Sequence, residues 1–126
     1  MAEILYKEES YEIIGKCMQV HRELGNGFLE IVYKDALEYL FQKYDIPYER
    51  EKEYVVQFED VILPHKFYAD FVVYDKIILE VKAVKDFTPE HFAQTINYLK
   101  VSDNQLGLLV NFGKASFESK RFLNEY

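Results

Sequence analysis

The first 47 residues contain two segments in which apolar residues recur at helical spacing, 10–24 and 29–44. Ser10 is the expected N-cap of the first segment, because its hydroxyl can accept from a backbone N–H of the first turn. The Gly-Asn-Gly stretch at 25–27 ends it, since glycine and asparagine tolerate the left-handed conformation of a helix terminus. Pro47 ends the second segment, because the residue before a proline is pushed out of helical geometry. The pattern predicts two consecutive amphipathic helices.

The pattern then changes to the alternation that is typical of strands. Residues 53–59 and 66–74 alternate, and Pro64 is expected to close the turn between them. Residues 77–84 follow a polar turn at 74–76 and are almost continuously apolar, which indicates a strand covered on both faces. The sequence predicts a three-stranded meander.

Thr88 begins a further helix, with a proline at the first helical position, and this helix is expected to run to about Val101. The apolar run 106–112 is then a buried strand, which a crossover helix should place parallel to the strand 77–84. The tail 115–126 is consistent with either a short edge strand or a last helical turn. We expect one α/β domain over residues 1–126, with a mixed central sheet flanked by helices.

Three charged residues interrupt the second and third strands of the meander: Asp70, Glu80 and Lys82. Glu80 and Lys82 are two positions apart and share a strand face, and the hairpin brings Asp70 alongside them. Buried charges are costly unless they are paired or bind something. Two carboxylates suit Mg²⁺ or Mn²⁺, and an adjacent lysine can position the attacking water in hydrolysis of a phosphodiester. The alternative is an ordinary ion pair between Glu80 and Lys82 on a half-exposed strand.

Asp70 and, ten positions later, Glu80-Val81-Lys82 resemble the motif of the PD-(D/E)XK nuclease superfamily, within the expected order of elements. This resemblance implies a restriction-endonuclease-like core, with Asp70, Glu80 and the Val81 carbonyl as metal ligands and Lys82 activating water. Ala69 stands where the superfamily motif has its proline.

Gln94 and Tyr98 resemble the Q-x-x-x-Y helix motif of the RecB-like branch of these nucleases. The resemblance implies that both residues line the catalytic cleft and orient the substrate or the lysine. They lie one turn apart on one helix face. The alternative is an ordinary polar edge of an amphipathic helix.

The segment 27–33 resembles the signature of the GxxExxY proteins, a family grouped with these nucleases. The resemblance places Glu30 at the metal site, where an acid from the helix before the sheet completes the ligand set. The alternative is that Glu30 only favours the positive end of its helix, worth ~0.3–1 kcal/mol.

The net charge of −7 is unfavourable for gripping a nucleic-acid backbone, which is normally contacted by lysine and arginine. A protein partner or a homo-oligomer would relieve this difficulty.

The single Cys17 fits a reducing cytoplasm and is expected to be a core residue. The N-terminus is acidic and no apolar run is long enough to span a membrane, so the sequence predicts neither a signal peptide nor a membrane span. The three histidines have no zinc-site spacing.

The interpretation is a Mg²⁺- or Mn²⁺-dependent nuclease acting on nucleic acid, DNA rather than RNA. Two other functions remain open: a catalytically inactive module that uses the nuclease fold for binding, and a hydrolase of small phosphoesters. For a metal-free protein the sequence also predicts that Asp70→Ala is stabilising, because it removes one of several crowded carboxylates.

Overall fold

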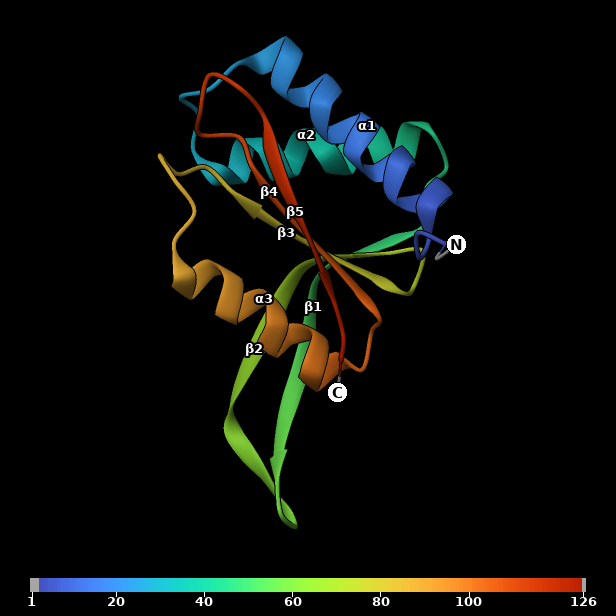
Figure 1. Ribbon diagram of the computed structural model, residues 1–126, viewed down its shortest axis with the longest axis vertical. Coiled ribbons are helices and arrows are strands. Elements are labelled where there is room, and N and C mark those ends of the chain that lie inside the picture. The colour runs from blue at the N-terminus through green and yellow to red at the C-terminus, as the bar shows by residue number, and fades with distance from the viewer. Residues whose placement is uncertain (1–2, 126) are drawn as a thin grey trace.

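The computed structural model describes residues 3–125, in which two helices precede a five-stranded sheet and a third helix crosses it (Figure 1). The first helix, α1 (Lys7–Leu24), has Tyr6 at the N-cap position. The prediction of Ser10 as N-cap is therefore wrong. Two acids in the first turn, Glu8 and Glu9, favour the positive helix end and extend the helix toward the N-terminus. Ser10 is buried inside the helix and donates to the Lys7 carbonyl at 3.1 Å.

The helix α2 (Glu30–Lys43) follows a loop that begins at Gly25. Gly25 has φ 71°, a positive value that favours glycine, and its N–H donates to the His21 carbonyl, so α1 ends at the glycine that the sequence predicts. Tyr33 holds this loop: its hydroxyl donates to the Gly25 carbonyl at 2.7 Å and accepts from the Phe28 N–H at 3.2 Å. The first turn of α2 therefore has a defined position relative to α1.

The strands β1 (Tyr48–Phe58) and β2 (Val61–Val73) form a hairpin that is longer than the alternating pattern predicts. Pairing begins at Tyr48↔Val73, five residues before the expected start of β1. Pro64 was expected to close the turn between these strands. This prediction is wrong, because Pro64 lies within β2. No partner is assigned to residues 63–65, opposite the register shift between Val55 and Gln57, and proline is tolerated at such an irregularity because it donates no ladder hydrogen bond.

The remaining elements are β3 (Ile77–Lys82), α3 (Pro89–Ser102), β4 (Leu106–Asn111) and β5 (Glu118–Leu123). Thr88 caps α3 as expected, accepting from the His91 N–H at 3.4 Å. Pairing of β3 with β4 is parallel, which confirms the crossover, and β5 pairs antiparallel with β4. The tail is thus an edge strand. The sheet order β1-β2-β3-β4-β5 confirms the predicted mixed α/β fold.

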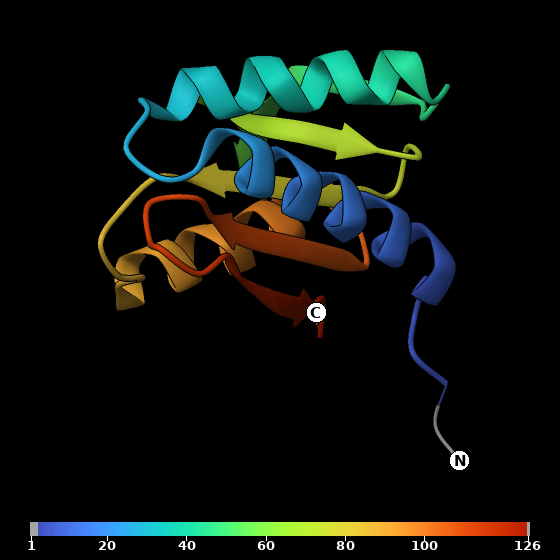
Figure 2. The same ribbon diagram turned by 90° about the horizontal axis from the view of Figure 1, so that it is seen from above.

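The helices lie in two layers on opposite faces of the sheet: α1 and α2 cover one face and α3 the other (Figure 2). The larger core lies under α1 and α2 and includes Ile13, Cys17, Phe41, Phe71 and Leu79. A smaller core under α3 is formed by Ala69, Val72, Ile78 and Leu99. Within residues 3–125, no helix has both the length and the apolar composition needed to span a bilayer. The expected domain also included residues 1, 2 and 126, which lie outside the described part.

Candidate active site

The backbone ladder between β2 and β3 covers only three residue pairs and ends at Phe71↔Leu79. Beyond that pair, two acidic side chains accept hydrogen bonds from backbone N–H groups of β2 and β3. The Asp70 N–H donates to Glu80 Oε2 at 2.7 Å, and the Val81 N–H donates to Asp70 Oδ2 at 2.8 Å. The opening of the ladder therefore places the two acids directly beside each other.

Glu80 is almost completely buried, with 2% of its surface exposed. Burial raises the pKa of its carboxyl well above the usual value, and the neighbouring Asp70 carboxylate raises it further, while the Asp70 N–H opposes the shift. A bound cation would favour the ionised form of the Glu80 carboxyl beside the Asp70 carboxylate.

Lys82, Gln94 and Tyr98 form a chain of contacts from β3 to α3. The Lys82 ammonium donates to Gln94 Oε1 at 3.3 Å, and Gln94 Nε2 donates to the Tyr98 hydroxyl at 2.9 Å. The Tyr98 ring stacks on Phe67 of β2, with 4.4 Å between centroids. Burial, followed by the charges of Glu80 and Asp70, raises the pKa of Tyr98 to about 12. The Tyr98 phenol therefore stays protonated at neutral pH, and its oxygen accepts the hydrogen bond from Gln94.

Glu30 is the first residue of α2 and is half-buried near the same acids. Burial raises the pKa of its carboxyl, Asp70 raises it further, and Lys82 and Lys34 oppose the shift. Among residues 3–125, however, no three His, Cys, Asp or Glu side chains are arranged to hold a metal ion. The donor set present is the pair of carboxylates of Asp70 and Glu80, and two hard oxygen donors with water fit Mg²⁺ or Mn²⁺.

Two residues that contact the candidate site were missed by sequence reasoning: Lys34 of α2 and Glu51 of β1. The Lys34 ammonium donates to Asp70 Oδ1 at 2.8 Å and also to Glu51 Oε1. Burial lowers the pKa of Lys34, but the hydrogen bonds to Asp70 and Glu51 outweigh burial and raise it overall. Lys34 follows Glu30 by four positions, so helical spacing alone could have placed it on the same face. Glu51 carried no comparable signal.

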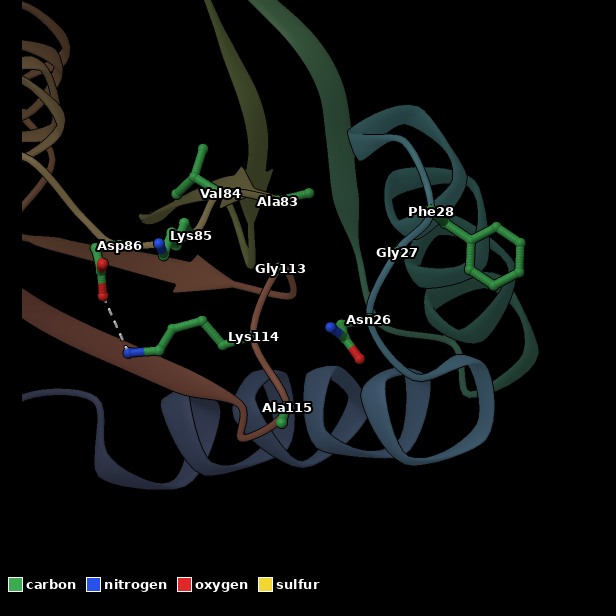
Figure 3. Close-up of a pocket in the computed structure, with 10 residues that line it drawn as sticks. All are labelled: Asn26, Gly27, Phe28, Ala83, Val84, Lys85, Asp86, Gly113, Lys114 and Ala115. Carbon is green, nitrogen blue, oxygen red and sulfur yellow. Dashed lines mark hydrogen bonds and ion pairs between the residues drawn. The ribbon is translucent and has the colours of Figure 1, made fainter.

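A cavity of about 520 Å³ opens at the carboxyl ends of the parallel strands β3 and β4 (Figure 3). Its lining includes Phe28 from the loop before α2, Val84 and Lys85 after β3, and Lys114 after β4, which contacts Asp86 at 3.4 Å. None of the predicted site residues lines it, although its walls continue directly from Lys82 and lead to Glu30. The cavity is therefore separate from the candidate site residues.

The buried side chain of Asn111 joins the loops around this cavity. Its amide nitrogen donates to the Val84 carbonyl and its oxygen accepts from the Val84 and Gly113 N–H groups, all at 2.9 Å. Asn111 is completely buried, so these bonds hold the segment after Lys82 against the end of β4.

The family model of the PD-(D/E)XK nuclease superfamily matches residues 7–122 of the chain. No curated protein matches it. Among solved structures, the crystal structure of SSO0001 is similar, with a TM-score of 0.56 and 17% identity over 74% of this chain and 48% of that chain. The chain thus spans about half the length of that protein, and a likeness at this identity shows the fold alone.

Proposed function

The chain belongs to the PD-(D/E)XK nuclease superfamily, and on this premise we propose that it is a Mg²⁺- or Mn²⁺-dependent nuclease that hydrolyses phosphodiester bonds in nucleic acid. The observation that carries the proposal is the hydrogen bond from the Asp70 N–H to the Glu80 carboxyl at the end of the β2–β3 ladder, with Lys82 on the same face of β3 as Glu80. Nucleases of this superfamily generally use divalent metals.

Asp70 and Glu80 would hold the ion, and the Val81 carbonyl and Glu30 would be its further oxygen ligands. A divalent ion at such a site lowers the pKa of bound water and polarises a phosphoryl oxygen. Lys82 orients the attacking water and stabilises the negative charge that develops as the new P–O bond forms and the bond to the leaving oxygen breaks. Gln94 positions the Lys82 ammonium, and Tyr98 positions Gln94, as their hydrogen bonds indicate.

We assign the chain more narrowly to the RecB-like branch and to the GxxExxY proteins, on Gln94 and Tyr98 and on the segment 27–33. The role of Tyr33 in holding the loop before Glu30 gives this signature a physical reason. We further propose action in the cytoplasm and on DNA rather than RNA. A second copy or a basic partner protein would supply the positive surface that a chain of net charge −7 lacks.

The test is cleavage of single- and double-stranded DNA and RNA by metal-stripped protein to which Mn²⁺ is added back. Lys82→Ala should lower the rate at least about 100-fold, a typical contribution of one residue that activates water. Lys43→Ala, at the exposed last turn of α2, is the matched control and should cleave like wild type. Equal cleavage by wild type and Lys82→Ala would mean contamination and would remove the enzyme proposal.

A metal-free binding module is the second candidate, and the ion pair of Lys34 with Asp70 favours it, because an ammonium already neutralises one of the two acids. Calorimetry separates the two functions: a module shows no heat of Mn²⁺ or Mg²⁺ binding, whereas the nuclease binds one of them. The net charge of −7 favours a third function, the hydrolysis of a small phosphoester. A protein with this function would cleave a mononucleotide ester and would leave polymeric DNA and RNA intact.

A further inference from the structure

Lys34 is a buried cation in contact with a proposed metal ligand. Its side chain is 7% exposed, and its ammonium bonds to Asp70 Oδ1 at 2.8 Å. Lysine is rarely buried to this degree unless it is paired. Its four-carbon stem comes from α2, one turn after Glu30, and reaches the sheet at the point where the β2–β3 ladder opens.

Both oxygens of Asp70 are engaged in this arrangement. Oδ2 accepts from the Val81 N–H at 2.8 Å, and Oδ1 accepts from Lys34. The Asp70 side chain is only 13% exposed, so little solvent screens its attraction to the ammonium. A divalent ion that binds Asp70 must either displace Lys34 or approach a fixed positive charge.

Glu51 provides a second place for the ammonium. It already accepts from Lys34, and its own side chain is 47% exposed, so it faces the solvent side of the cluster. The lysine stem is flexible and its three donors rotate freely. The ammonium can therefore leave Asp70 and keep an ionic partner.

We propose that Lys34 is the resident counter-ion of the acidic site and sets its affinity for metal: a divalent ion binds in exchange for the ammonium, which withdraws from Asp70 and remains on Glu51. This inference rests on the proposed metal site and adds its regulation. Lys34 is a positioning residue, and without metal it keeps the acids of the site together.

The test is calorimetric titration of Mn²⁺ into metal-stripped wild type, Lys34→Met and Lys34→Gln. Both variants should bind Mn²⁺ at least ten-fold more tightly than wild type, because the competing charge is gone. The amide of Lys34→Gln is a hydrogen-bond donor toward Asp70. This variant therefore keeps the test possible if Lys34→Met does not fold. Lys52→Gln, on the same strand as Glu51 and paired with Glu49 at 2.9 Å, controls for the loss of one positive charge.

Equal Mn²⁺ affinity in wild type and the Lys34 variants overturns the inference, and so does the absence of Mn²⁺ binding in all of them. A measurement on wild type alone serves if neither variant folds: the ¹⁵N signal of the Lys34 ammonium should shift in step with Mg²⁺ binding. Mg²⁺ binding without that shift also overturns the inference.

The cleavage assay keeps this inference separate from the proposed function. Cleavage by wild type with unchanged metal affinity in the Lys34 variants leaves the nuclease intact and removes the exchange. Tighter Mn²⁺ binding by Lys34→Gln without cleavage by any form supports the exchange and removes the nuclease.

Discussion

At the scale of single residues, the site is defined by side chains that take over backbone roles. The Glu80 carboxyl accepts from the Asp70 N–H, and the Asp70 carboxylate accepts from the Val81 N–H. The Asn111 side-chain oxygen likewise accepts from backbone N–H groups, those of Val84 and Gly113 in the loops after β3 and β4. Substitutions at these positions therefore act on the backbone as well as on charge.

The structure reverses the expectation that Asp70→Ala stabilises the metal-free protein. Removing the Asp70 carboxylate leaves the buried Lys34 ammonium with Glu51 as its remaining ionic partner. Because Glu51 still pairs with the ammonium, we expect the loss of the hydrogen bonds to Asp70 to lower the free energy of unfolding by about 1–3 kcal/mol, measured by urea denaturation with chelator present.

The double variant Asp70→Ala/Lys34→Met provides the check. Because it removes both charges, it should recover part of the stability that Asp70→Ala loses. A single Asp70→Ala variant as stable as wild type would contradict the assigned ion pair.

Gly113 lies where the backbone of the segment after β3 approaches most closely. A Cβ at this position would lie 2.4 Å from the Val84 nitrogen and from its carbonyl oxygen. Gly113→Ala should lower the free energy of unfolding by about 1–3 kcal/mol, since the obstacle is backbone that must shift. Gly15→Ala is the control, because nothing lies within 4 Å of a Cβ there and alanine favours the helix by about 1 kcal/mol. Thermal unfolding that ranks the two variants in the opposite order would refute this packing.

At the scale of elements, the hairpin of β1 and β2 extends well beyond the body of the protein (Figure 1). Its outer part carries exposed apolar side chains: Val55, Phe58, Val61 and Ile62. Its inner part holds the site, through Glu51, Asp70 and the ring of Phe67 that stacks on Tyr98. The two halves of one hairpin therefore have different importance for folding.

Polar substitution at the hairpin tip should leave the fold intact. Phe58→Ser and Ile62→Ser should each change the free energy of unfolding by less than about 0.5 kcal/mol, because both side chains are already exposed to water. Phe71→Ala, in the fully buried part of β2, is the contrast and should cost about 3–5 kcal/mol. Chemical denaturation measures all three, and a tip variant as damaging as Phe71→Ala would show that the tip is buried in solution.

At the scale of the whole molecule, the acidic site makes stability depend on pH. Burial and Asp70 raise the pKa of Glu80 in the folded protein, so the folded state holds this proton more tightly than the unfolded chain. The contribution of Glu80 to stability is fully present below the unfolded pKa, about 4.3, and is lost as the pH rises through the folded pKa. Neutral pH is where the burial of its charge costs most.

Glu80→Gln should therefore gain stability relative to wild type as the pH rises from about 4 to 7. The amide is neutral throughout, and its oxygen can still accept from the Asp70 N–H. Urea denaturation at several pH values with chelator measures the difference, with Glu23→Gln on the exposed side of α1 as the control. A difference that does not change with pH would contradict the buried, protonated carboxyl.

Local patterns were sufficient for most of the fold and part of the site. The helical and strand periods identified all three helices and the strands β1 to β4, because those periods follow from backbone geometry. The contact of Asp70 with Glu80 followed from the meander, and the link from Lys82 to Gln94 and Tyr98 agrees with the motif they resemble. The start of β1 was missed because residues 48–52 alternate only weakly and form a strand through pairing with β2.

The sequence by itself determined the three helices and the first four strands, that β3 and β4 run parallel, and that acids lie on neighbouring strands, since each of these depends on spacing along the chain. Tertiary structure alone decided that the tail is an edge strand and that Lys34 meets Asp70 and Glu51. The physical reason is that an ion pair among residues from one helix and two strands depends on how those elements pack. No local period in the sequence encodes that packing, and the packing places the Lys34 ammonium beside Asp70.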